Sequence, residues 1–151
     1  MEEKRNVEQL LKDGVTVQFH PQGESMFPLF VRESDYAIVE PAQAPFRRLE
    51  VYVFRSSLGP LTIHRLKKIT PQGLYFIGDR QQAIEGPIAP EMVYGRMTAY
   101  IRKGRKHSVK YLPYRIYAAA WMLLRPCRFF LFKIGHYCKV IVLKIKGGKT
   151  K

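Results

Sequence analysis

The chain has 151 residues, of which 46% are apolar, and it carries a formal net charge of +14. This length suits a single domain, which can bury a hydrophobic core without support from metals or disulfides. The two cysteines, Cys127 and Cys138, are too few for a disulfide framework and lack the paired spacing of a zinc site, so we expect no metal and no other cofactor.

The positive charge is concentrated in the C-terminal third. All twelve carboxylates lie between Glu2 and Glu91, where twelve Lys and Arg side chains balance them, and the other fourteen basic residues lie between Arg102 and Lys151. The sequence therefore predicts a balanced domain over residues 1–104 and a basic extension over residues 105–151.

The order of local patterns predicts a mainly β fold. A short amphipathic helix is expected between Glu2 and Asp13, and this charged N-terminal segment has no apolar run long enough for a signal sequence or membrane anchor. Strands are then expected at Val15–Phe19, Tyr36–Val39, Val51–Phe54, Leu61–Ile69, Leu74–Ile77 and Met92–Ile101. After Gly104 we expect two helices, Tyr114–Leu124 and Arg128–Ile145, separated by Pro126.

Three short blocks contain side chains suited to nucleophilic chemistry. Ser25 follows a glycine turn directly after a predicted strand, His64 lies within a predicted strand, and Asp79 and Glu85 come after the next one. Serine becomes a nucleophile when a base accepts its proton, and a third group usually orients that base. An unperturbed imidazole, with a pKa of about 6.5, is such a base near neutral pH.

Lys68 lies too far along the strand from His64 to replace it as the base, and Lys67 is expected to point to the opposite face of the sheet.

Six blocks in the same order make residues 15–102 resemble the signal peptidase I superfamily, which includes the self-cleaving SOS repressors. The blocks are the serine box Gly23–Pro28, the segment Glu33–Val39, the strand Val51–Arg55, the base-bearing box Ile63–Leu66, the pair Gly78-Asp79 and the closing strand Val93–Arg96. The resemblance implies a signal peptidase/LexA-like β-rich catalytic domain, with a short N-terminal helix and two C-terminal helices added in this chain.

The resemblance also implies a serine endopeptidase that cleaves a leader or precursor peptide. Ser25 would be the nucleophile and His64 the general base, as in the histidine branch of the family found in the endoplasmic reticulum and in sporulation. Glu85 matches the carboxylate that completes the triad in that branch, and Asp79 is the second candidate. Gly23 replaces a serine that often donates to the oxyanion, which leaves backbone N–H groups as donors.

The basic extension suggests a different class of function. An apolar helix face edged by Lys and Arg can lie on an anionic membrane, where Tyr114, Tyr117 and Trp121 would suit the interface. The alternative hypothesis is therefore a noncatalytic protein of peptidase fold that binds anionic membrane or nucleic acid through this tail. No specific nucleic-acid motif is present. We expect a cytoplasmic location, with peripheral binding at the inner face of the membrane as an option.

Overall fold

The computed structural model describes residues 6–31, 34–56 and 59–127. The chain divides into two compact units, residues 1–118 and residues 119–151. The sheet and every candidate catalytic side chain belong to the first unit, which is the one considered below.

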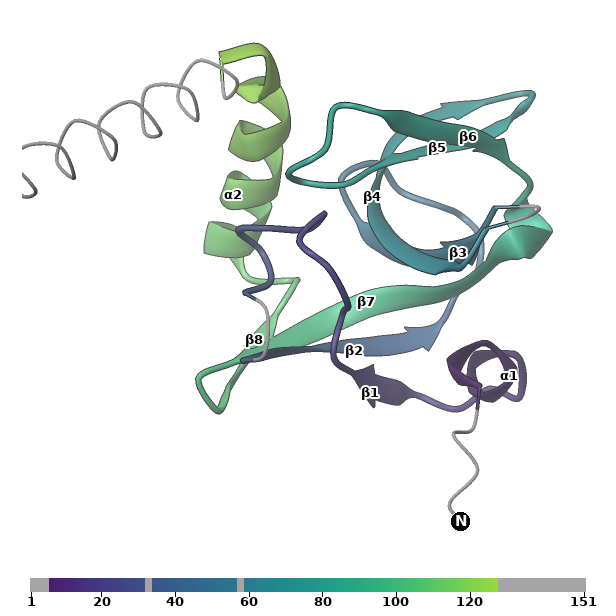
Figure 1. The fold of residues 1–151 in the computed structure, drawn as a ribbon, viewed down its shortest axis with the longest axis horizontal. Helices are drawn as coiled ribbons and strands as arrows, with labels where there is room; N and C mark the ends of the chain where they lie inside the picture. The colour runs from purple at the N-terminus through teal and green to yellow at the C-terminus, as the bar shows by residue number, and fades with distance from the viewer. Residues whose placement is uncertain (1–5, 32–33, 57–58, 128–151) are drawn as a thin grey trace, which may run out of the picture. The chain divides into compact units, whose positions relative to one another are not determined.

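The first unit is built on one antiparallel sheet of eight strands (Figure 1). The strands are β1 (Val17–Phe19), β2 (Asp35–Pro41), β3 (Val51–Arg55), β4 (Leu61–Thr70), β5 (Gly73–Ile77), β6 (Ile84–Ile88), β7 (Val93–Arg102) and β8 (Arg105–Ser108). They are arranged in the order β1-β2-β7-β3-β4-β5-β6, and β8 pairs with β7. The sheet curls strongly from β3 to β6, and register shifts within four of the strand pairs accompany this curvature.

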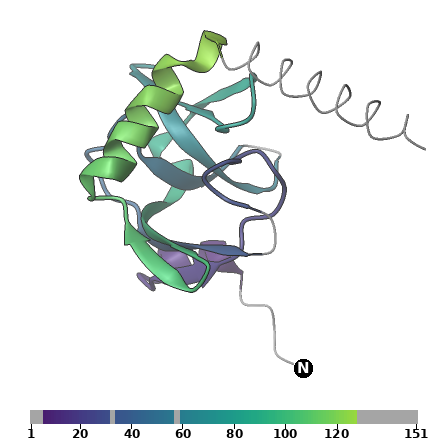
Figure 2. The ribbon, with the colours of Figure 1, turned by 90° about the vertical axis from the view of Figure 1, so that its left-hand side faces the viewer.

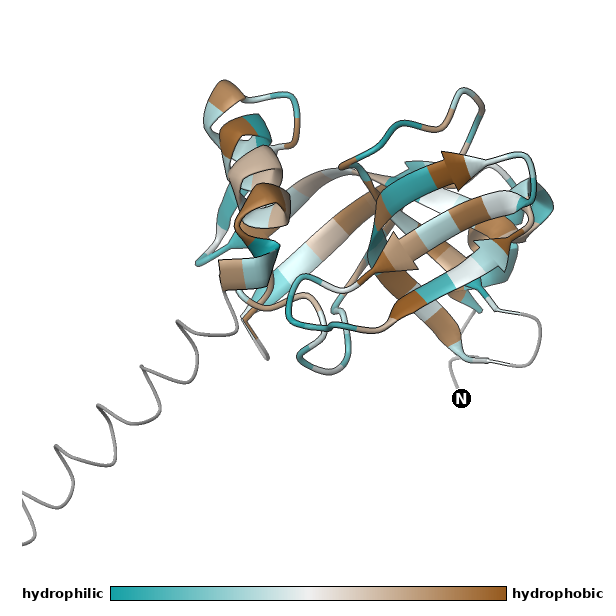
Figure 3. Ribbon diagram, turned by 90° about the horizontal axis from the view of Figure 1, so that it is seen from above, coloured by the Kyte–Doolittle hydropathy of each residue, from teal (hydrophilic) through white to brown (hydrophobic). Residues whose placement is uncertain are grey.

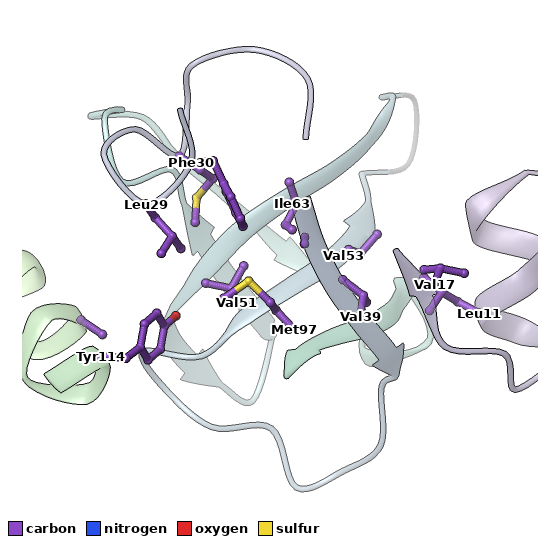
Figure 4. Close-up of a cluster of buried hydrophobic side chains, with 13 residues drawn as sticks. Leu11, Val17, Leu29, Phe30, Val39, Val51, Val53, Ile63, Met97 and Tyr114 are labelled. Atoms are coloured by element: carbon purple, nitrogen blue, oxygen red, sulfur yellow. The ribbon is translucent and has the colours of Figure 1, made fainter. Parts of the chain in front are cut away.

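The hydrophobic core consists of two clusters, and strand β3 contributes to both. Its side chains alternate between the sheet faces, so that Val51 and Val53 enter one cluster while Tyr52 and Phe54 enter the other. Figure 4 shows the first and larger cluster, which reaches from Leu11 to Tyr114. Because both faces of β3 are covered, its residues Val51–Phe54 are all buried and do not alternate with exposed polar residues. Figure 3 shows brown, hydrophobic residues on several strands of the sheet.

Within the described residues, two α-helices and one 3-10 helix accompany the sheet. Helix α1 (Val7–Lys12) begins at Asn6, whose side chain accepts a hydrogen bond from the backbone of Glu8, and it buries Leu11 in the larger cluster. The 3-10 helix η1 (Pro90–Met92) leads into β7. Helix α2 (Leu112–Leu123) follows β8 and buries Tyr114 and Ala118.

The prediction of a mainly β fold with a short N-terminal helix and a C-terminal helix is confirmed, and all six predicted strands are present. The predicted second C-terminal helix, Arg128–Ile145, lies outside the described residues. Two strands were missed. Strand β6 contains Gly86-Pro87, and its proline can be accommodated because β6 is the edge strand. Strand β8 is polar and lacks apolar alternation, and its place is fixed by pairing with β7.

Candidate active site

Ser25 lies on a loop of irregular structure, residues 20–31, between β1 and β2. The turn before it uses Gly23 at a φ of 82°, a backbone conformation that favours glycine. The loop lies beside the segment that follows β5, as two views agree (Figures 1 and 2). The backbone N–H of Arg80 donates to the carbonyl oxygen of Ser25 at 2.7 Å. A β-carbon at Gly78 would lie only 2.7 Å from the same oxygen, so Gly78 is needed for this close approach.

Asp35, whose carboxylate is buried, holds the two flanks of the Ser25 loop through its backbone carbonyl and its carboxylate. The backbone carbonyl of Asp35 lies 2.7 Å from Nδ1 of His20, and the Asp35 carboxylate accepts from the backbone N–H of Val31 at 2.9 Å. Arg102 bonds this carboxylate and also donates to the carbonyl oxygens of Pro28 and Leu29 at 2.8 and 2.7 Å. Burial alone would favour a neutral Asp35, but these hydrogen bonds outweigh it and lower the pKa of the carboxyl.

His64 lies in the middle of β4, opposite Tyr52 of β3, and is only 2% exposed. Its ring lies 6.1 Å from the ring of Phe54. Burial lowers the pKa of His64 to about 4, and the nearby negative charge of Asp79 opposes this shift. The imidazole is therefore neutral at neutral pH, which is the form that can accept a proton.

Ser25 and His64 line the same pocket, which has a volume of about 690 Å³. We call it the Ser25 pocket. It is lined by Val7, residues 19–25, Val53, residues 60–64, Gln81 and Glu85. The loop, two central strands, the edge strand β6 and helix α1 thus meet around the serine, and the volume is within the usual range of ligand pockets.

Glu85 is the carboxylate nearest to the base. Its Oε1 atom lies 3.0 Å from Nδ1 of His64, although the two groups are not aligned as a hydrogen bond. Strand β6 brings it there by pairing Glu85 with Phe76 of β5. Burial raises the pKa of Glu85. A carboxylate at this position can orient the imidazole and stabilise its positive charge when it accepts a proton.

Asp79, the second candidate for that role, has a different set of contacts. Its two carboxylate oxygens accept from Nε and Nη2 of Arg65 at 2.8 and 2.7 Å, in a bidentate pair from which water is excluded. The hydroxyl of Tyr117 also donates to Asp79, at 3.1 Å, and Nη1 of Arg65 donates to the hydroxyl of Tyr114. Tyr114 and Tyr117, which we expected at a membrane interface, therefore cover this ion pair.

The two neighbouring lysines do not approach the pocket. Neither Lys67 nor Lys68 is among its lining residues. A bulge between Leu66 and Lys68 interrupts the alternation of β4, and the Lys68 ammonium lies over the Tyr75 ring, 5.9 Å from its centre.

Comparisons with family models, curated proteins and solved structures give no match. The functional reading therefore depends on the chain's own residues. Within the described ranges, no group of three His, Cys, Asp or Glu side chains is placed to hold a metal ion. No helix in that same part of the chain is long and apolar enough to cross a membrane.

Several residues around the site were not singled out from the sequence. Arg65 and Arg102 look like ordinary strand cations, yet each is bound to a carboxylate that is at most 2% exposed. His20 and Gln81 line the Ser25 pocket without any recognisable motif. For Arg65 one signal was available, since a cation next to a predicted base in an apolar strand requires a buried counter-charge.

Proposed function

We propose that this protein is a serine endopeptidase of the signal peptidase/LexA-like type. The observation that carries the proposal is the common pocket of Ser25 and His64, with Glu85 at 3.0 Å from Nδ1 of the imidazole. The three residues come from a loop and two strands that are separated in sequence. In addition, the Gly78–Arg80 segment and the Asp35–Arg102 pair hold the Ser25 loop in place.

In the proposed mechanism, the hydroxyl oxygen of Ser25 attacks the carbonyl carbon of a peptide bond while Nε2 of His64 accepts the hydroxyl proton. Glu85 stabilises the resulting imidazolium, and backbone N–H groups stabilise the oxyanion. The imidazolium then donates its proton to the leaving amine, which leaves an acyl-enzyme on Ser25. Water, deprotonated by His64, hydrolyses the ester and restores the serine. The substrate class is a leader or precursor peptide.

Hydrolysis of a peptide library by the purified full chain tests the proposal. We expect Ser25→Ala and His64→Ala to abolish cleavage, since the hydroxyl and the base act as one unit. Lys67→Ala and Lys68→Ala are matched controls on the same strand and should keep full activity. A phosphonate probe should label the wild type at Ser25, as located by mass spectrometry. Cleavage that persists in Ser25→Ala would refute the assignment.

Peripheral binding to an anionic membrane is a second proposed function, supported by the exposed side of α2. Tyr111, Leu112 and Ile116 are 59–67% exposed, and the basic residues Lys110 and Arg115 lie beside them in sequence. Sedimentation with anionic vesicles, with zwitterionic vesicles as control, tests it. Replacing Leu112 and Ile116 together by Asn should release the protein, and binding that is unchanged would exclude this surface.

A further inference from the structure

One side of the Ser25 pocket is an apolar wall made by three different elements. Val7 of α1, Phe19 of β1 and Leu61 of β4 all line the pocket. Each of the three is partly buried and packs against the larger core cluster. Their inner sides therefore contribute to the core while their remaining surface is available to an occupant of the pocket. Val53 and Ile63, which are almost fully buried, extend this surface.

Helix α1 is held firmly enough to serve as part of this wall. Leu11 is 2% exposed, and its methyl groups lie so close to Gly95 that a β-carbon there would approach them to 2.9 Å. On the side of the helix nearer its start, Glu8 forms an ion pair with Arg55 at the end of β3, at 2.6 Å. Val7 is thus fixed by the contacts of two residues that follow it on the helix, Glu8 and Leu11. This helix precedes residues 15–102, which resemble the signal peptidases, so the contribution of Val7 to the wall lies outside that resemblance.

The charges around the pocket favour a neutral occupant over an acidic one. Among the described residues, its lining includes two carboxylates, Glu24 and Glu85, and no Lys or Arg. A carboxylate entering the pocket would lose its hydration without gaining a cationic partner, whereas an aliphatic or aromatic side chain would bury its surface against the wall.

We propose that Val7, Phe19 and Leu61 form a side-chain subsite that selects substrates with a large apolar residue beside the scissile bond, and that Val7 limits the size of that residue. This inference rests on the proposed peptidase function. An apolar side chain bound against these three residues would lie in the same pocket as Ser25 and His64. Val7 is then a specificity-determining residue.

The test uses a peptide that the wild type cleaves, resynthesised with Ala, Leu, Phe or Asp before the cut. We expect kcat/KM for Leu and Phe to exceed that for Asp by about 100-fold or more. Val7→Trp should lower kcat/KM for Phe by about tenfold while changing that for Ala by less than about threefold, because a bulkier wall excludes only large side chains. Val15→Trp is the control, since Val15 is exposed and does not line the pocket. An equal effect on all peptides, or none, would overturn the proposal.

Two further experiments cover the cases in which Val7→Trp does not fold or the wild type cleaves no peptide. If Val7→Trp unfolds, Val7→Ala should instead raise the rate for a naphthylalanine peptide relative to Leu by about threefold, and an unchanged ratio would contradict the subsite. If the wild type cleaves no peptide, the same side chains are presented in labelled peptides, and binding to the full chain is measured by fluorescence polarisation. A Phe preference that Val7→Trp removes would then support the subsite while the peptidase proposal fails. Equal binding of all four peptides would overturn the subsite.

Discussion

Asp79 and Glu85 are six residues apart and have different surroundings near the same histidine. Asp79 is 2% exposed, and both of its oxygens are bound to Arg65. Glu85 is about one-third exposed in its side chain and lies beside His64, and no Lys or Arg within the described part of the chain forms an ion pair with it. A carboxylate whose two oxygens both accept hydrogen bonds from a buried arginine stabilises the fold. A carboxylate without such bonds can stabilise the positive charge of a neighbouring imidazole when that ring becomes protonated. Comparing the two shows that proximity to a base does not by itself define a catalytic role.

The largest effect on stability should follow from removing the buried negative charge of Asp79. Asp79→Asn leaves the Arg65 guanidinium buried with an uncompensated charge, so we expect the free energy of unfolding to fall by about 3–5 kcal/mol. Denaturant titration followed by circular dichroism measures this. The control is Glu24→Gln, which breaks the exposed ion pair with Arg80 and should cost less than about 1 kcal/mol. A stable Asp79→Asn protein would contradict the structural role of this residue.

The next effect is a pH dependence of stability caused by His64. The folded-state pKa of about 4 lies below the unfolded value of 6.5, so between these pH values the unfolded chain binds a proton that the folded protein does not. Acidification through this window therefore favours unfolding, by up to about 3 kcal/mol. Unfolding of the wild type and of His64→Gln is compared at pH 7 and pH 5. The His64→Gln variant should lose a large part of the difference in stability, and an equal difference in both proteins would contradict the shift.

A smaller effect is expected from Glu85, and it should concern activity rather than stability. Glu85→Gln removes the charge that stabilises the imidazolium, and we expect kcat to fall by about 10- to 100-fold, which corresponds to about 1.4–2.7 kcal/mol. The free energy of unfolding should change by less than about 1 kcal/mol. Peptide hydrolysis and thermal melting of the same preparation separate these two effects. If Glu85→Gln is fully active, the triad reduces to Ser25 and His64.

The smallest effect on stability should come from Tyr117, which covers the ion pair between Arg65 and Asp79. Tyr117→Phe removes a single hydroxyl that donates to Asp79, and the expected loss of stability is about 1 kcal/mol. Tyr111→Phe, one residue before the start of the same helix and largely exposed, is the control and should be neutral. Equal thermal melting points for the two variants would show that the Tyr117 hydroxyl does not stabilise Asp79.

The strands that were predicted from the sequence share one property, which is a continuous or alternating run of apolar residues. Burial of such a run is a local requirement, so it can be seen in the sequence without knowing the partner strand. Strands β6 and β8 lack this signal because their positions are set by pairing with β5 and β7. Glu85 lies on β6, and its contact with His64 therefore could not have been derived from local pattern alone.

The sequence by itself determined the class of the fold, because runs of apolar residues and their order are sufficient for this. The candidate set Ser25, His64, Glu85 and Asp79 came from residue types together with the family resemblance, and the division into a balanced domain and a basic extension stays a prediction. Only the tertiary structure distinguished the two carboxylates, and it did so by placing Arg65 against Asp79 and leaving Glu85 at the imidazole. The same holds for Val7, which reaches the Ser25 pocket only because Leu11 anchors its helix in the core. The physical reason is that hydrogen bonds, ion pairs and pocket walls join residues far apart in the chain, and their partners are chosen by packing rather than by sequence neighbours.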